Sequence, residues 1–206
     1  MGAAVSFEDL AGTIRELSPS CGPVRVVAVD GPGGSGKTTF AKRLARTLGA
    51  QVVHSDDFPV PWDEPPVAWF QRVEDQVLGP LAAGEPGGYR RYDWVRGGFA
   101  EWVDVPVAPV LLLEGVSTAR RTAPTALTIW VEAPRDLRLA RALVRDGASF
   151  APQWHDWMRA EDEWFAADGT RSRADLLLDG ASVPGEFVMI PSPPREEHRR
   201  LRPHAT

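Results

Sequence analysis

A glycine-rich segment at residues 31–38, with the sequence GPGGSGKT, constrains the fold of this chain more than any other feature. It follows an apolar run rich in β-branched residues at residues 24–29 and opens a pattern of strong helix formers at residues 37–48. Glycines permit positive φ angles and let backbone N–H groups turn toward phosphate oxygens, and the N-terminus of the following helix adds partial positive charge. Because strand, loop and helix are in register, the segment predicts a phosphate-binding loop for a nucleoside triphosphate rather than a plain glycine-rich turn.

Two side chains of this loop supply its charge and its metal chemistry. Lys37 is expected to place its ammonium group against the β- and γ-phosphates. Thr38 offers a hydroxyl to Mg²⁺, which keeps several waters and takes few protein ligands. The motif does not indicate what the nucleotide is used for. The predicted nucleotide-binding residues are Gly31, Gly33, Gly34, Ser35, Gly36, Lys37, Thr38 and Thr39.

Strand and helix patterns alternate along the rest of the chain. Strands joined by helices imply parallel pairing, with helices on both faces of the sheet. We therefore predict an α/β fold, namely a P-loop NTPase three-layer αβα architecture with a five-stranded parallel sheet. The predicted strands are residues 24–29, 51–54, 110–113, 127–131 and 174–178, and the predicted helices are residues 7–17, 37–48, 67–81, 134–145 and 152–167.

The chain length suits a single domain, which we expect over residues 1–191. Within it, residues 134–170 are expected to form a lid region, and the glycine- and arginine-rich residues 84–98 to be irregular. The last stretch, residues 192–206, is rich in proline, arginine and histidine and is predicted to be a surface tail that is partly disordered.

Charge and cysteine content limit the class of protein. The chain has 23 basic and 28 acidic residues, a formal net charge of −5, so it lacks the basic excess of a general nucleic-acid binder. Its single cysteine excludes an internal disulfide, and it shows neither a signal-peptide pattern nor an apolar run of about 18 residues. We expect a cytoplasmic protein that acts on a small molecule and has no nucleic-acid or membrane partner, with homo-oligomerisation left open.

Acidic side chains follow two of the predicted strands. Asp56 and Asp57 come after the second strand, and Glu114 ends the third. In an open α/β sheet, ligands bind beyond the carboxyl ends of the strands, so these groups should face the phosphate-binding loop. A carboxylate there can deprotonate or orient an attacking hydroxyl group, or hold Mg²⁺. Loop solvation and helix capping are the alternative interpretation.

Arginines recur along the predicted helix of residues 134–145. Arg138, Arg141 and Arg145 follow an i, i+3, i+7 spacing that places them on one stripe. The stripe is interpreted as a lid that closes over phosphates, although a solvated helix face would show the same pattern.

These motifs together resemble the uridine kinase-like group of P-loop small-molecule kinases. The order and spacing match over roughly residues 24–180. Besides the phosphate-binding loop, the segments that carry the resemblance are Ser55-Asp56-Asp57-Phe58, Tyr92-Asp93-Trp94, Leu112-Leu113-Glu114-Gly115, Arg138-Leu139-Ala140-Arg141 and Arg145-Asp146.

The resemblance implies roles for the reacting side of the site. It places Asp56 at the catalytic carboxylate, close to the acceptor hydroxyl and to Mg²⁺, and Glu114 at the strand-end carboxylate near the metal. Arg141 and Arg145 fall on the lid helix, where guanidinium groups clamp the transferring phosphates. With Lys37, these residues form the predicted catalytic set.

The resemblance also implies an acceptor pocket, and here the chain departs from the family. Asp63 falls where an aspartate binds ribose hydroxyls, and Tyr92 and Trp94 fall on aromatic positions that line the nucleoside pocket. However, no base-reading histidine follows Trp94, Glu64 stands before proline where close relatives have histidine, and Pro59 replaces a tyrosine. Each departure lies on the acceptor side.

Three hypotheses follow. The first is an ATP- and Mg²⁺-dependent kinase that transfers the γ-phosphoryl group to a hydroxyl of a small molecule, a uridine- or cytidine-like nucleoside by resemblance. The second keeps the kinase chemistry but changes the acceptor to a sugar, a vitamin precursor or a natural product. The third is a regulatory protein that binds nucleotide and has no acceptor.

Overall fold

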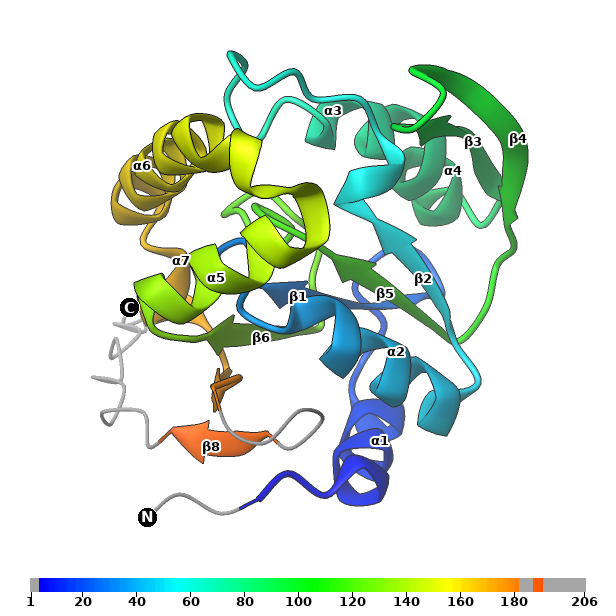
Figure 1. Ribbon diagram of the computed structural model, residues 1–206. Helices are drawn as coiled ribbons and strands as arrows, with labels where there is room; N and C mark the ends of the chain where they lie inside the picture. The colour runs from blue at the N-terminus through cyan, green and yellow to red at the C-terminus, as the bar shows by residue number, and fades with distance from the viewer. Residues whose placement is uncertain (1–3, 182–186, 191–206) are drawn as a thin grey trace, which may run out of the picture.

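The computed structural model describes residues 4–181 and 187–190 as an α/β protein built around one central sheet (Figure 1). The predicted tail, residues 192–206, lies outside the described residues. In this part of the chain, no helix is long and apolar enough to cross a membrane.

The central sheet has six strands, in the order β2-β5-β1-β6-β7-β8. The first five in that order pair in parallel, as the sequence predicts. The strands are β1 (Arg25–Asp30), β2 (Gln51–His54), β5 (Val110–Glu114), β6 (Leu127–Glu132), β7 (Leu176–Asp179) and β8 (Val188–Ile190).

The predicted strand count is wrong by one, because β8 adds an antiparallel edge to β7. Val188 pairs with Asp179, and Ile190 pairs with Leu177. Three residues are too few to show a period of two, so β8 carries no sequence signal of its own. Residues 188–190 form a strand only because they pair with the edge of β7.

A separate two-stranded sheet joins β3 (Gly87–Asp93) and β4 (Gly98–Val105), which the sequence interpretation missed by treating residues 84–98 as irregular. The cause is the shortage of apolar residues in this charged, glycine-rich stretch. The hairpin is instead held by tertiary contacts: the Tyr89 ring stacks on Phe58 at 4.8 Å, and its hydroxyl donates to Asp57 at 2.6 Å.

Helices cover both faces of the central sheet. Alternate side chains of β1 face opposite layers: Val27 and Val29 pack with α1 and α2, and Val26 packs with the segment that includes α3 and α4. The helices are α1 (Phe7–Glu16), α2 (Lys37–Leu48), α3 (Phe70–Val73), α4 (Gly79–Ala82), α5 (Arg135–Asp146), α6 (Ala151–Asp168) and α7 (Thr170–Arg173).

The helix predicted over residues 67–81 is present but interrupted. A π-helical turn, η2 (Glu74–Leu78), separates α3 from α4, and Pro80 sits in the first turn of α4. Proline has no N–H to donate and its ring crowds the preceding turn, which accounts for the widened backbone before it. Two short 3₁₀ turns complete the chain: η1 (Ser55–Asp57) follows β2, and η3 (Ala148–Phe150) joins α5 to α6.

The helices α5 and α6 lie against the glycine-rich loop that follows β1. A Cβ atom at Gly34 would lie 2.5 Å from the carbonyl oxygen of Arg138 in α5, and one at Gly33 would lie 2.9 Å from the Trp154 ring in α6. The predicted lid region is therefore in direct contact with the loop it was expected to cover.

Candidate active site

The loop between β1 and α2 has the backbone geometry of an anion site. Gly34 and Gly36 have φ angles of 75° and 105°, which residues other than glycine rarely adopt. The Lys37 side chain is largely buried, and its Nζ donates to the Pro32 carbonyl at 2.9 Å. The buried Ser35 Oγ has no hydrogen-bond partner among the described residues. An unpaired buried hydroxyl and a lysine held at the loop fit a phosphate ligand.

Of the predicted nucleotide-binding residues, Thr38 and Thr39 are exposed in the first turn of α2.

Asp30 connects the start of this loop to the loop that follows β5 through hydrogen bonds. Its Oδ1 accepts the N–H groups of Gly31 at 2.7 Å and Ser117 at 3.0 Å, and its Oδ2 accepts the N–H of Ala119 at 2.8 Å. The side chain is completely buried, and this desolvation raises the pKa of Asp30 to about 7, although the three N–H donors and Lys37 oppose the shift. Asp30 therefore positions two functional loops at once.

Replacing Asp30 with asparagine is expected to change how stability depends on pH. The folded-state pKa of about 7 lies above the ordinary value of 3.8, so the folded chain binds this proton more tightly than the unfolded chain. Stability contributed by Asp30 is therefore present below about pH 4 and falls as pH rises toward 7, by on the order of 4 kcal/mol. Asparagine has no such proton.

The measurement is urea unfolding of both chains between pH 4 and 8, followed by tryptophan fluorescence. The wild-type chain should lose stability relative to Asp30→Asn as pH rises through this window. A difference that stays constant across the window would show that the carboxyl group of Asp30 does not titrate there.

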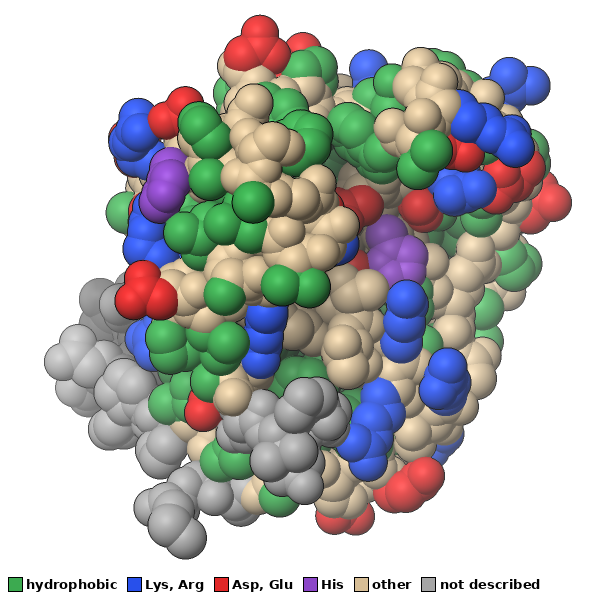
Figure 2. Space-filling view, in the orientation of Figure 1, with side chains coloured by type: hydrophobic (Ala, Val, Ile, Leu, Met, Phe, Trp, Pro, Cys, Tyr) green, Lys and Arg blue, Asp and Glu red, His purple; other side chains and the backbone are tan. Residues whose placement is uncertain are grey.

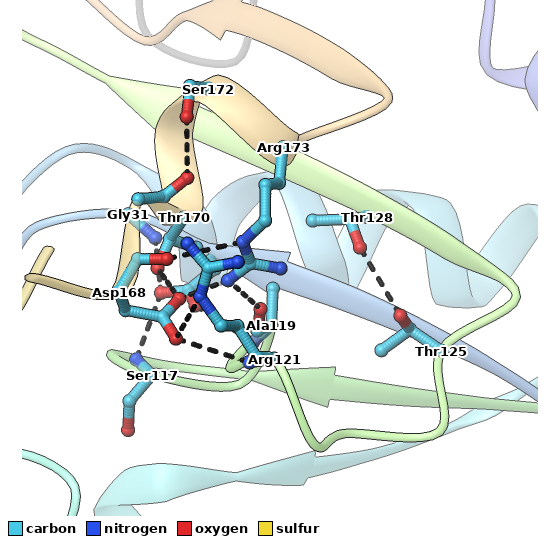
Figure 3. A network of polar contacts seen from close by, with 12 residues as sticks. Gly31, Ser117, Ala119, Arg121, Thr125, Thr128, Asp168, Thr170, Ser172 and Arg173 are labelled. Carbon is cyan, nitrogen blue, oxygen red and sulfur yellow. Dashed lines mark hydrogen bonds and ion pairs between the residues drawn. The ribbon is translucent and has the colours of Figure 1, made fainter. Parts of the chain in front are cut away.

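The loop after β5 is also tied to the far end of α6. Figure 3 shows Asp168 facing the backbone N–H of Arg121, at 3.2 Å, and the hydroxyl of Thr170, at 2.5 Å. Arg173 bonds to the Asp168 carboxylate and to the Ala119 carbonyl. The N–H of Ala119 also donates to Asp30. The loop after β5 therefore connects the C-terminal end of α6 to the start of the phosphate-binding loop.

Glu114, at the end of β5, lies beside Thr38, the other residue predicted to be near Mg²⁺. Its Oε1 accepts the Thr38 hydroxyl at 3.2 Å, and its Oε2 lies 2.6 Å from His54 Nδ1. His54 is the direct neighbour of Glu114 in the parallel register of β2 and β5. Burial lowers the pKa of His54, but the hydrogen bond and charge of Glu114 outweigh this effect and raise it.

Sequence reasoning missed His54. The signal was present, because residues that end adjacent parallel strands meet at the same edge. Within the described residues, no three His, Cys, Asp or Glu side chains converge to hold a metal by themselves. Thr38 and Glu114 together fit a Mg²⁺ ion that takes its remaining ligands from water and phosphate.

Asp56, in η1, lies close to these groups. In Figure 2, acidic side chains and a histidine gather beside the end of β2, in the hollow between α5 and the β3–β4 hairpin. The carboxylate still contacts solvent, yet desolvation by the surrounding atoms raises the pKa of Asp56, and the charge of Glu114 raises it further. The positive charges of Arg145 and Lys37 act in the opposite direction.

The hairpin brings two of the three predicted acceptor residues to Asp56. Trp94 Nε1 donates to the Asp56 carbonyl at 2.6 Å, and the Tyr92 and Trp94 rings meet edge to face at 4.9 Å. The third, Asp63, is exposed, and among the described contacts it makes no hydrogen bond with the hairpin or with Asp56. Its neighbour Trp62 instead packs against the lid aromatics Phe150, Trp154 and Trp157.

Two arginines of the α5 stripe, Arg138 and Arg141, contact the phosphate-binding loop, whereas the Arg145 side chain is 59% exposed. Arg141 donates to the Gly34 carbonyl at 3.2 Å and to the Gly180 carbonyl at 3.0 Å, so it joins the phosphate-binding loop to the end of β7. Arg145 pairs with Asp146 at 2.7 Å and acts electrostatically on Asp56 and Glu114. Arg138 is buried and lies 3.4 Å from the Gly33 carbonyl. The sequence analysis placed Arg138 on the predicted lid stripe but not in the predicted catalytic set.

Solved structures share the fold of this chain. A protein described as a possible uridine kinase from Bacillus stearothermophilus superposes with a TM-score of 0.61 at 19% identity, over 83% of this chain and 96% of that one. A candidate fructose transport system kinase from Silicibacter sp. TM1040 gives a TM-score of 0.55 at 21% identity, over 80% of this chain and 95% of that one.

This chain has the fold of the P-loop kinases. No family model matches its sequence. A tRNA dimethylallyltransferase from Nitratidesulfovibrio vulgaris (strain DSM 19637 / Miyazaki F) is 46% identical over 61 residues, which is 30% of this chain. The match spans only 18% of that enzyme's length.

Gly180, just after β7, shows how closely the P-loop kinase fold is packed at this point. A Cβ atom there would lie 2.0 Å from the Ser35 carbonyl oxygen, so Gly180→Ala is expected to push the phosphate-binding loop out of place and weaken nucleotide binding at least about tenfold. Isothermal titration with Mg-ATP measures the loss. In Gly12→Ala, the matched control, the new methyl group meets nothing within 4 Å, and affinity should be unchanged. Equal affinities for the two variants would contradict the prediction.

Proposed function

We propose that this chain is a kinase that uses ATP and Mg²⁺ to transfer the γ-phosphoryl group to a hydroxyl group of a small molecule. The observation that carries the proposal is the position of Asp56 in η1, directly after β2, at the sheet edge where Glu114 ends the neighbouring strand β5 and contacts Thr38 of the phosphate-binding loop. The backbone carbonyl of Asp56 accepts the indole N–H of Trp94, so Asp56 also lies beside the aromatic hairpin. A carboxylate between these two features suits an acceptor hydroxyl group.

The donor side follows from the loop. Its backbone N–H groups and Lys37 hold the β- and γ-phosphates, and Arg141 and Arg145 approach from the lid. Thr38 and Glu114 hold Mg²⁺, which when bound neutralises the charge that develops on the phosphate oxygens. Ser35 adds a buried hydroxyl that is free to bond to phosphate.

Asp56 performs the proton transfer. It accepts the proton of the acceptor hydroxyl while the acceptor oxygen bonds to the γ-phosphorus and the bond to the bridging oxygen of ADP breaks. A raised pKa makes Asp56 a stronger base than an ordinary carboxylate, which suits this role near neutral pH.

The acceptor is proposed to be a planar hydroxylated molecule such as a uridine- or cytidine-like nucleoside. Tyr92 and Trp94 offer aromatic faces beside Asp56. The solved structure described as a possible uridine kinase supports the same class. A sugar, a vitamin precursor or a natural product is the second candidate, favoured by the exposed position of Asp63 and by the missing histidine after Trp94.

An acceptor panel tests the proposal. ATP consumption is measured with Mg²⁺ and each of uridine, cytidine, other nucleosides, sugars and hydroxylated vitamin precursors. Turnover that requires uridine or cytidine supports the first acceptor class, and turnover with another compound supports the second. A chain that binds ATP tightly but shows the same slow hydrolysis with every compound is a nucleotide-dependent regulatory protein, and the kinase proposal fails.

A further inference from the structure

Glu161, in the middle of α6, is a buried carboxylate that the proposed reaction does not use. Its side chain is completely buried. The N–H of Gly33, in the phosphate-binding loop, donates to Glu161 Oε1 at 2.9 Å and to Oε2 at 3.1 Å. The indole Nε1 of Trp157, one turn earlier in α6, donates to Oε1 at 2.6 Å.

Positive charge faces the same carboxylate. Arg138 of α5 lies 3.6 Å from Glu161 Oε2, and the ammonium group of Lys37 acts on Glu161 electrostatically. Burial raises the pKa of Glu161, but every contact that the structure gives its oxygens comes from a donor or a cation. Such surroundings accept no proton from the carboxyl group, so these contacts favour the ionised form of Glu161.

These partners are the kinds of group that bind a phosphate oxygen. One is a backbone N–H of the phosphate-binding loop, one is the lysine of that loop, and one is an arginine of the lid. Gly33 comes early in the loop, three residues before the glycine that caps α2, so the carboxylate contacts the first half of the loop. Space there is tight, because a Cβ atom at Gly33 would lie 3.0 Å from Glu161 Oε1.

We propose that Glu161 is an internal anion that binds the first half of the phosphate-binding loop, and that the polyphosphate of a bound nucleotide replaces it. The inference rests on the phosphate-binding role of the loop and not on the identity of the acceptor. Replacement frees Gly33 and Lys37 for phosphate, and it releases α6 from the loop. The lid is thereby coupled to nucleotide binding. Because the nucleotide has to replace Glu161, its affinity for the chain is lower than it would be for a loop without this carboxylate.

Glu161→Gln tests the replacement, because it removes the charge and keeps an oxygen that accepts the Gly33 N–H. Neutral hydrogen bonds are about half as strong as charge-assisted ones, so the variant should bind Mg-ATP about tenfold more tightly by isothermal titration. Inorganic pyrophosphate, the second probe, should show a gain in the same direction. Adenosine, which has no phosphate, should bind each chain equally.

Glu163→Gln is the matched control, since Glu163 lies in the same helix and is exposed. Its affinity for both probes should equal that of the unmodified chain. Glu161→Asp serves if the first variant does not fold, because it draws the carboxylate back by one methylene group and should also raise affinity. Equal or weaker binding of pyrophosphate by the folded variants overturns the proposal. Pyrophosphate binding needs neither ATP specificity nor turnover, so this result is distinct from a failure of the kinase assignment.

Discussion

Replacing Lys37 with alanine is expected to lower the rate of phosphoryl transfer by about a hundredfold to a thousandfold. The Lys37 ammonium group is held inside the phosphate-binding loop, where it meets little water. A positive charge that is already fixed in a water-poor site stabilises the transferring phosphoryl group far more than the charge of an exposed lysine does. The measurement is kcat for ATP consumption with the acceptor that the panel identifies.

Lys42→Ala is the control for this prediction. Lys42 lies in the same helix α2 but is exposed, so its loss should leave kcat within about twofold of the unmodified chain. Thermal unfolding of both variants establishes that they are folded. Substantial turnover by folded Lys37→Ala would falsify the assignment of the loop.

Replacing Asp56 with asparagine is expected to lower kcat by about a hundredfold to ten-thousandfold, the range for loss of a general base. Asparagine has nearly the same shape but cannot take the acceptor proton. Since the Asp56 carbonyl, and not its side chain, binds Trp94, the aromatic hairpin should stay in place and KM for the acceptor should change little. Steady-state kinetics that separate kcat from KM provide the test.

Asp57→Asn is the matched neighbour. The Asp57 side chain accepts the Tyr89 hydroxyl at 2.6 Å, and asparagine can still accept it through its carbonyl oxygen. This variant should keep most of the activity. If Asp57→Asn lost as much kcat as Asp56→Asn, or if Asp56→Asn remained fully active, the catalytic base would have to be another group.

The elements predicted most accurately are those whose patterns are local. Helix α2 has the predicted bounds, because Gly36 and Gly49 flank it with left-handed backbone and its apolar positions repeat on one face. Strands β1, β5 and β6 are buried along nearly their whole length, so each appears in the sequence as an apolar run. The β3–β4 hairpin could not be found in this way, because contacts with Phe58 and Asp57, more than 25 residues away in sequence, stabilise it.

The same distinction holds in the candidate site. Asp56 and Glu114 were predicted to lie together because strand ends of a parallel sheet share an edge. Glu161 was not given a role, because its role depends on a contact with Gly33 across more than 100 residues of chain. A buried carboxylate in a helix pattern looks like any polar helix residue until its partners are known.

The sequence by itself determined the phosphate-binding loop, the parallel α/β architecture and the carboxylates at the strand ends. Each of these depends on residue type, on spacing or on the order of strands and helices along the chain. Only the tertiary structure decided that Asp30 joins two loops, that His54 pairs with Glu114, and that Glu161 reaches the loop from the lid. The physical reason is that hydrogen bonds and ion pairs act over a few ångströms, between groups that folding alone brings together.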